Sequence, residues 1–129
     1  MENQSQLAEM LTEHGRWQQQ ILKYKDALSE MKETLGVLVA KHTPRDVPAN
    51  AEHFQNQFIL QRDVLDRMRH DFKQYENRIE EAQSSETSVP ENLLQVRQAY
   101  QARLADYDKL FTELKSEFQA FKKADTIPA

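Results

Sequence analysis

The sequence of 129 residues contains no cysteine, and this absence excludes several kinds of chemistry. Without thiols the chain cannot form disulfides, thiolate zinc sites or iron–sulfur clusters, and it has no cysteine nucleophile. Glycine is almost as scarce, because the whole chain holds only Gly15 and Gly36. A phosphate-binding loop needs a glycine-rich turn between a strand and a helix, so none is expected here.

The sequence also lacks a long apolar run and an excess of positive charge. Its longest apolar run extends from Val37 to Ala40, whereas a membrane span needs about 20 such residues. The N-terminus does not resemble a secretion signal. Seventeen basic and 21 acidic residues give a formal charge of −4, which disfavours nucleic acid and anionic lipid as main partners. We therefore expect a cytoplasmic protein that does not bind membranes.

Two short stretches combine helix-breaking residues with a loss of apolar periodicity. In residues 43–50, Pro44 and Pro48 predict that the first helix ends near Lys41 or His42. In residues 84–90, Ser88 or Thr87 is expected to cap the third helix, with Pro90 in its first turn. The resulting prediction is one domain with helices over about 3–42, 50–83 and 89–124.

All three segments repeat apolar residues at spacings of three and four, which keeps these side chains on one helical face. In the first segment the two columns are Leu7, His14, Ile21, Leu28, Leu35 and His42, and Met10, Trp17, Tyr24, Met31 and Leu38. In the second they are Ala51, Phe58, Leu65, Phe72 and Ile79, and Phe54, Gln61, Met68, Tyr75 and Ala82. The third follows Leu93, Val96, Tyr100, Leu104, Tyr107, Phe111, Leu114, Phe118 and Phe121. This pattern predicts an all-α fold, an elongated antiparallel three-helix bundle with coiled-coil-like packing.

The up-down-up arrangement also predicts which core residues share a layer. Trp17 is expected near Phe72, Tyr75 and Tyr100 at one level. Farther along the bundle, the middle layer is expected to hold Tyr24, Leu28, Leu65, Met68 and Tyr107. At the far end we expect a layer built from Leu35, Leu38, Phe54, Phe58, Leu114 and Phe118.

Histidine is the residue type most able to support chemistry, but no catalytic or zinc-binding motif surrounds any of the four. His42 and His53 flank the first turn, where they can meet and hold a metal ion. Partly exposed polar residues at a helix end are the favoured interpretation. His14 lies in a core column and is expected to form a hydrogen bond or specify register. We expect no enzyme activity, no cofactor and no resident metal.

The most charged stretch of the sequence lies between residues 62 and 73. Its basic residues can contact a phosphate, a nucleic acid or a nucleic-acid enzyme: Arg62, Arg67, Arg69, His70 and Lys73. Carboxylates alternate with them, however, and helical spacing can pair Asp63 with Arg67 and Asp66 with Arg69 or His70. We therefore favour a solvated helix face over a nucleic-acid contact.

Some small and apolar residues lie outside the core columns. Gly15 and Gly36 are three heptads apart in one column with Ala8, Leu22 and Ser29, and small residues allow another helix to approach closely. These residues and further apolar side chains predict a self-association surface and an extended homodimer: Gly15, Leu22, Gly36, Val39, Leu60 and Val64.

Two resemblances add to this interpretation. The core Trp17 followed by two more heptad-patterned helices resembles the architecture of spectrin-type repeats. The segments 54–59 (FQNQFI) and 69–76 (RHDFKQYE) resemble small uncharacterised all-helical proteins of Bacteroidetes bacteria. The second resemblance covers roughly a quarter of the chain and carries no catalytic residue. It directs attention to Asn56, His70 and Asp71, whose alternative role is packing.

Overall fold

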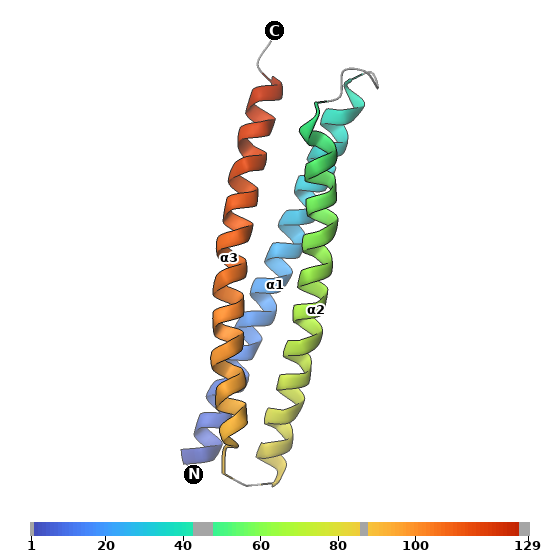
Figure 1. The fold of residues 1–129 in the computed structure, drawn as a ribbon. Coiled ribbons are helices and arrows are strands. Elements are labelled where there is room, and N and C mark those ends of the chain that lie inside the picture. Colours follow the sequence, from blue (N-terminus) through green and yellow to red (C-terminus); the bar gives the residue numbers. More distant parts are fainter. Residues whose placement is uncertain (1, 43–47, 86–87, 127–129) are drawn as a thin grey trace.

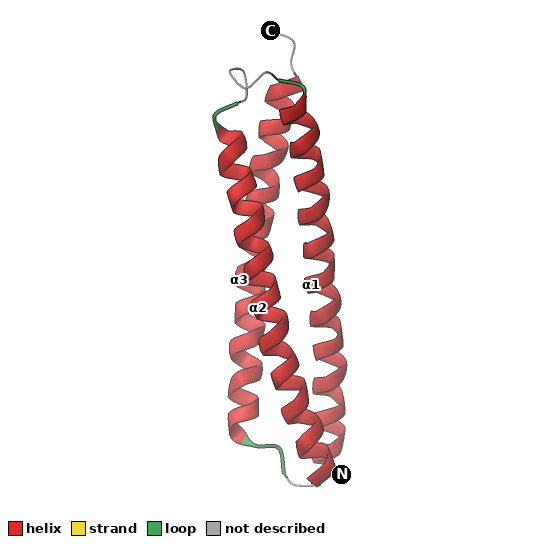
Figure 2. Cartoon of the chain, turned by 90° about the vertical axis from the view of Figure 1, so that its right-hand side faces the viewer, coloured by secondary structure: helices red, strands yellow, loops and turns green. Residues whose placement is uncertain are grey.

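Three long helices make up the fold of this chain, seen in a computed structural model that describes residues 2–42, 48–85 and 88–126 (Figure 1). Helix α1 covers Glu2–Ala40, α2 covers Asn50–Ser85 and α3 covers Glu91–Thr126. The helices lie side by side along one long axis (Figure 2), with α2 antiparallel to α1 and α3. The predicted all-α three-helix bundle is therefore confirmed.

The helix ends agree with the predicted boundaries to within two residues, but the details differ. After Ala40, the amides of Lys41 and His42 donate to the carbonyls three residues earlier at 3.2 and 3.1 Å, which tightens the last turn. Pro90 precedes α3 instead of lying in its first turn. Its carbonyl accepts a hydrogen bond from the amide of Leu93 at 3.0 Å. The predicted breaker Pro44 and the alternative cap Thr87 lie outside the described residues.

The core consists of the predicted heptad columns. Two polar members of these columns are buried as well, since His14 is 2% exposed and Gln61 is 5% exposed, whereas His42, just beyond the end of α1, is half-buried. The predicted layers are confirmed by ring contacts. The Trp17 ring centroid lies 5.3 Å from that of Phe72, the Tyr24 and Tyr107 centroids are 5.1 Å apart, and those of Phe58 and Phe118 are also 5.1 Å apart.

The three helices are not equally close to one another. Helices α1 and α2 approach each other more closely than either approaches α3. The α3 side of the core is filled by large rings, including Tyr107, Phe111 and Phe118. The seams beside α3 are therefore wider than the seam between α1 and α2. In the described ranges, none of the helices combines the length and apolarity needed to cross a membrane.

Candidate functional site

His14 belongs to a small buried polar cluster between α1 and α2. Its Nδ1 lies 2.9 Å from Oε2 of Glu76, and its Nε2 lies 3.2 Å from the side-chain nitrogen of Gln18. Lys73 on the outside donates to the other oxygen of Glu76 at 2.7 Å. Burial lowers the pKa of His14 below its usual value, and the Glu76 carboxylate opposes that shift. His14 is buried at the centre of this cluster, whereas Glu76 is 21% exposed and Lys73 reaches solvent.

A second polar cluster joins α1 to α3 in the N-terminal half of both helices. Arg97 donates two hydrogen bonds to the carboxylate of Glu13, at 2.8 and 3.1 Å, and Gln101 adds a third at 3.1 Å. The hydrogen bond from Arg97 is the main cause that lowers the pKa of Glu13. Farther along the same seam, the Tyr24 hydroxyl donates to Asp108 at 2.5 Å. These contacts tie the two parallel helices together at this end.

The charged stretch between residues 62 and 73 is arranged differently from the prediction. Asp66 accepts a hydrogen bond from Lys25 of α1 at 2.6 Å and none from Arg69 or His70, the predicted partners, although the charge of Arg69 also helps to lower the pKa of Asp66. Asp71 likewise accepts from Arg103 of α3 at 2.8 Å. Both carboxylates sit beside a neighbouring helix, which offers a closer cation than their own helix does.

The basic residues of the same stretch consequently face solvent. Arg62, Arg67, Arg69 and His70 are exposed, and within the described ranges none of their side chains forms a hydrogen bond or ion pair, so the predicted Asp63–Arg67 pair is also absent there. Lys73 differs, because it is bonded to Glu76.

The six residues predicted for self-association do not share one face. Val39 belongs to the α1 column that includes Gln18 and Lys25, and both of those residues contact α2. Leu22, which is 39% exposed, lies in the column of Gly15, Ser29 and Gly36 at the outer edge of the α1–α2 seam. An added Cβ at either glycine would meet nothing within 4 Å, so this edge is open. Ser29 lines a hollow of about 130 Å³ there with Ile59 of α2.

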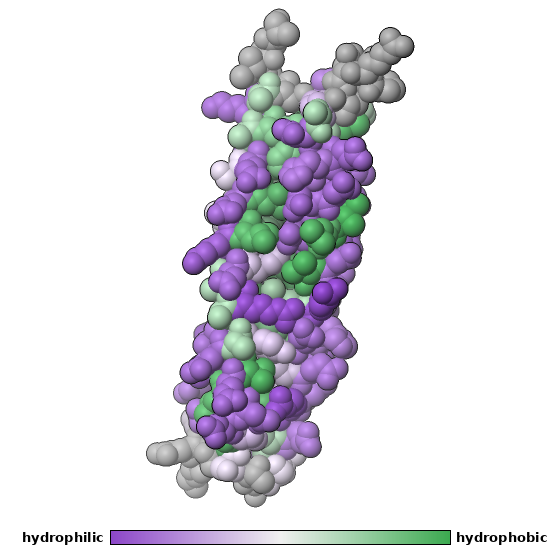
Figure 3. Space-filling model, in the orientation of Figure 1, coloured by the Kyte–Doolittle hydropathy of each residue, from purple (hydrophilic) through white to green (hydrophobic). Residues whose placement is uncertain are grey.

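The other two residues, Leu60 and Val64, lie on the opposite side of α2. Val64 is seven residues from Asp71, which pairs with α3, so both face that helix. Leu60 is one helical turn from Val64 and is 51% exposed, and Leu110 of α3 is 44% exposed. We call the surface formed by Leu60, Val64 and Leu110 the α2–α3 face. Figure 3 shows apolar surface over both helices on this side of the molecule.

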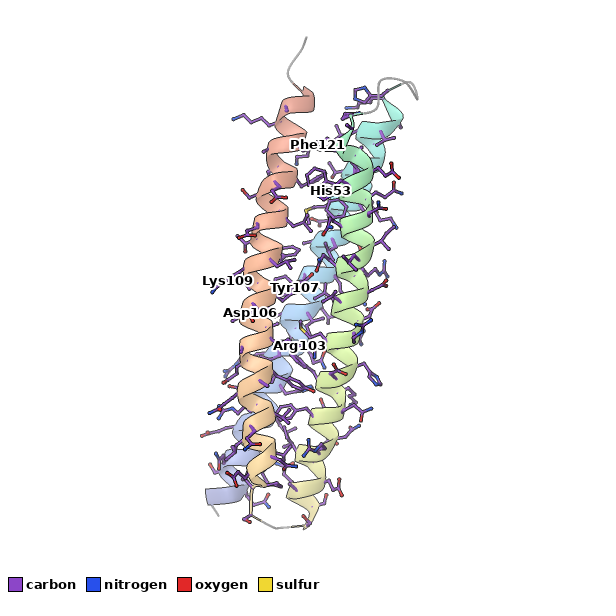
Figure 4. All side chains as sticks on the ribbon, viewed as in Figure 1. His53, Arg103, Asp106, Tyr107, Lys109 and Phe121 are labelled. Carbon is purple, nitrogen blue, oxygen red and sulfur yellow. The ribbon has the colours of Figure 1, made fainter. Side chains whose placement is uncertain are left out.

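Charged residues flank the α2–α3 face. Figure 4 shows Asp106 and Lys109 on the outer side of α3, whereas Tyr107 is directed toward the other two helices. Asp106 lies four residues before Leu110, and Glu113 and Glu117 lie three and seven residues after it; all three are exposed. Arg67 is exposed on α2. Helix α3 therefore carries acidic residues beside this face, and α2 carries a basic residue.

The described residues offer no metal centre, since no group of three or more histidine or carboxylate side chains gathers among them. His53 is exposed and lies against Phe54, with ring centroids 5.6 Å apart. It also lines a hollow of about 540 Å³ with Glu117 and Phe121 of α3. Of the residues indicated by the family resemblance, Asn56 and His70 are exposed and Asp71 holds α3 through Arg103.

Searches of protein-family models, of curated proteins and of solved structures find no match to this chain. The all-helical architecture agrees with the two resemblances seen in the sequence, but no relationship to spectrin repeats or to a bacterial family follows from it.

Proposed function

We propose that this protein is a non-enzymatic, cytoplasmic interaction protein that forms a homodimer through the α2–α3 face. The observation that carries the proposal is the pair of exposed leucines, Leu60 and Leu110, which continue a partly buried Val64 across two helices. Contiguous apolar surface of this kind marks protein contacts more often than isolated exposed side chains do. The charged side chains of both polar clusters are bonded to one another across or along the helices, which favours a structural role for them over catalysis.

The register of the bundle predicts how two copies meet. Because Phe72 contacts Tyr100 and Phe58 contacts Phe118, Val64 of α2 lies level with Leu110 of α3. By the same count, Arg67 lies level with Asp106. A two-fold axis parallel to the helices places α2 of one copy opposite α3 of the other at equal height. Leu60 and Val64 of each copy then pack against Leu110 of the other copy, so the contact occurs twice.

Charge favours this parallel dimer over an antiparallel one. In the parallel arrangement Arg67 faces Asp106 of the second copy, and the contact occurs twice by symmetry. An axis across the helices would instead set α3 against α3. Asp106, Glu113 and Glu117 would then face one another, and such like-charge contacts are unfavourable.

Sedimentation equilibrium of the full chain tests the proposal. We expect a dimer at tens of micromolar protein, and Leu110→Glu is expected to weaken association by at least about 100-fold, which corresponds to about 2.7 kcal/mol. Arg67→Asp is expected to weaken it less, and adding Asp106→Arg is expected to restore it. A monomeric wild type would refute self-association.

Two variants on the other edge serve as matched controls. Leu22→Glu and Gly36→Arg alter the exposed column of α1 and are expected to leave the dimer intact. Dissociation caused by Gly36→Arg, with Leu110→Glu remaining dimeric, would assign self-association to the α1 edge instead.

The unpaired arginines favour nucleic-acid binding as a second candidate function. Arg62, Arg67 and Arg69 are exposed. The nearby carboxylates Asp66 and Asp71 are hydrogen-bonded to cations of α1 and α3. This function requires binding of a single- or double-stranded oligonucleotide at low salt, with an affinity that falls steeply as salt is added. Loss of binding in Arg62→Ala/Arg69→Ala is the result expected for this function, and no binding at low salt would exclude it.

A further inference from the structure

A groove lies between α1 and α3 at the end of the bundle where both helices terminate. Its volume is about 720 Å³, and the described residues that line it are Thr34, Val37, Leu38, Lys41, Gln119, Ala120, Lys122 and Lys123. We call it the lysine groove. It lies apart from the α2–α3 face, because its walls come from α1 and from the side of α3 that faces α1.

The groove exists because this stretch of the seam has short side chains. Val37 and Ala120 cannot bridge two helices that stand apart around large core rings, and Val37 remains 58% exposed. A valine on a helix surface loses little by being exposed singly, but here it lies beside Leu38 and Ala120 and forms an apolar floor.

The rim of the groove is cationic. Lys41, Lys122 and Lys123 line it, and among the described residues no carboxylate does. In the described part of the chain, the ammonium groups of Lys41 and Lys122 have no hydrogen-bond or ion-pair partner. An apolar floor with a positive rim, on a chain whose net charge is −4, selects for an occupant that is apolar on one side and acidic at its edges.

We propose that the lysine groove binds an acidic amphipathic helix of a partner protein. Thr34 and Lys41 are two helical turns apart, or about 10 Å along α1. This length accepts two apolar side chains of a docked helix, at positions i and i+3 or i+4, over Val37 and Ala120. Glu or Asp residues beside those anchors reach Lys41 on one wall and Lys122 on the other.

The shape of the groove favours a helix over a small amphiphile such as a fatty acid. The groove is open to solvent between two parallel helices, so an acyl chain lying in it would leave much of its surface wet, whereas ligand pockets bury most of a small molecule. A docked helix covers the floor with one face and keeps its polar face in water, which is the usual geometry of helix-in-groove recognition.

Fluorescence anisotropy tests the proposal with a labelled synthetic peptide of about 16 residues, carrying Leu at i, i+3, i+4 and i+7 and Glu at the flanking positions. We expect a Kd of about 10–100 µM for the full-length protein. Val37→Glu is expected to weaken binding at least about tenfold, and Lys41→Glu and Lys122→Glu by about threefold to tenfold each. All three side chains lie on the surface, so the variants are expected to fold. An unchanged circular dichroism spectrum will establish that they do.

Matched controls make the outcome decisive. Lys109→Glu makes the same charge change on α3 outside the groove, and Ile59→Glu places the same acid on an exposed apolar site of α2. Both are expected to bind like the wild type.

The proposal fails if the peptide does not bind at millimolar protein or if a peptide with Lys in place of Glu binds equally. It also fails if Lys109→Glu weakens binding of the peptide as much as Lys122→Glu does. A Lys41→Glu variant that changes binding of the protein to phosphatidylglycerol vesicles, but not to the peptide, would overturn it as well. Repeating the titration with Leu110→Glu separates this site from the proposed dimer.

Discussion

The seam between α1 and α3 is built differently at the two ends of the bundle. At the N-terminal end of both helices, Glu13, Arg97 and Gln101 close it with three hydrogen bonds, and Tyr24 adds a fourth to Asp108. At the C-terminal end the same seam opens into the lysine groove. One pair of parallel helices thus has a polar, closed end and an apolar, open end.

The two ends are also held by different forces. In residues 28–40, 50–62 and 110–122 of the described chain, no side chain forms an interhelical hydrogen bond or ion pair, and aromatic packing fills the core instead. The polar end gains orientation from directed bonds, whereas the aromatic end depends on buried area alone. One end of the seam between α1 and α3 is thus fixed by hydrogen bonds, and the other end is accessible.

The largest expected effect comes from breaking the aromatic end. Phe118→Ala removes a ring that lies 5.4 Å from Phe54 and 5.1 Å from Phe58, and we expect it to lower the free energy of unfolding by about 3–5 kcal/mol. Urea denaturation measures this loss. At the polar end, Glu13→Gln breaks a partly exposed pair and is expected to cost at most about 1 kcal/mol. Equal costs at the two ends would contradict the comparison.

An intermediate effect is expected where the two ends meet, at Tyr24 and Tyr107. The Tyr24 hydroxyl is bonded to Asp108 and Gln20, and burial raises its pKa to about 12. The buried hydroxyl of Tyr107 has no partner among the described residues. Tyr24→Phe is therefore expected to cost about 1 kcal/mol, while Tyr107→Phe is neutral or stabilises by up to about 1 kcal/mol. Thermal denaturation of both variants checks the signs, and a matching loss in both would show that Tyr107 is bonded in solution.

The smallest expected effect is a pH dependence at the polar end. Burial lowers the pKa of His14 in the folded protein, so the unfolded chain takes up a proton at His14 first as the pH falls through about 6.5. Stability is therefore expected to fall between about pH 7 and pH 5, by a small amount because Glu76 partly offsets the burial. Urea midpoints for the wild type and His14→Leu measure this effect. An unchanged slope in His14→Leu would remove His14 as its cause.

Most of the fold follows from the heptad pattern in the sequence. Spacings of three and four placed even His14 and Gln61 in the core columns, and both are buried. The layers followed as well, since helices of similar length joined by short loops can meet in few registers. Proline positions marked the turns, although Pro90 lies before α3 and not within it.

The surface could not be predicted in the same way. The heptad repeat does not say which neighbour lies on which side of a helix. Asp66 consequently pairs with Lys25 and not with its own helix, and the six residues predicted for self-association divide between two edges. The lysine groove was missed because it depends on the distance between α1 and α3. The available signal was the pair of short side chains, Val37 and Ala120, near Lys41, which follows α1, and near Lys122 and Lys123 toward the end of α3.

The odd number of helices has a mechanical consequence. Helix α1 begins at one end of the bundle and α3 finishes at the other (Figure 1). Anything joined to the start of α1 is therefore held about 50 Å from anything joined to the end of α3, the length of a helix of 36 residues. A pulling force applied between these two points would run along the helix axes.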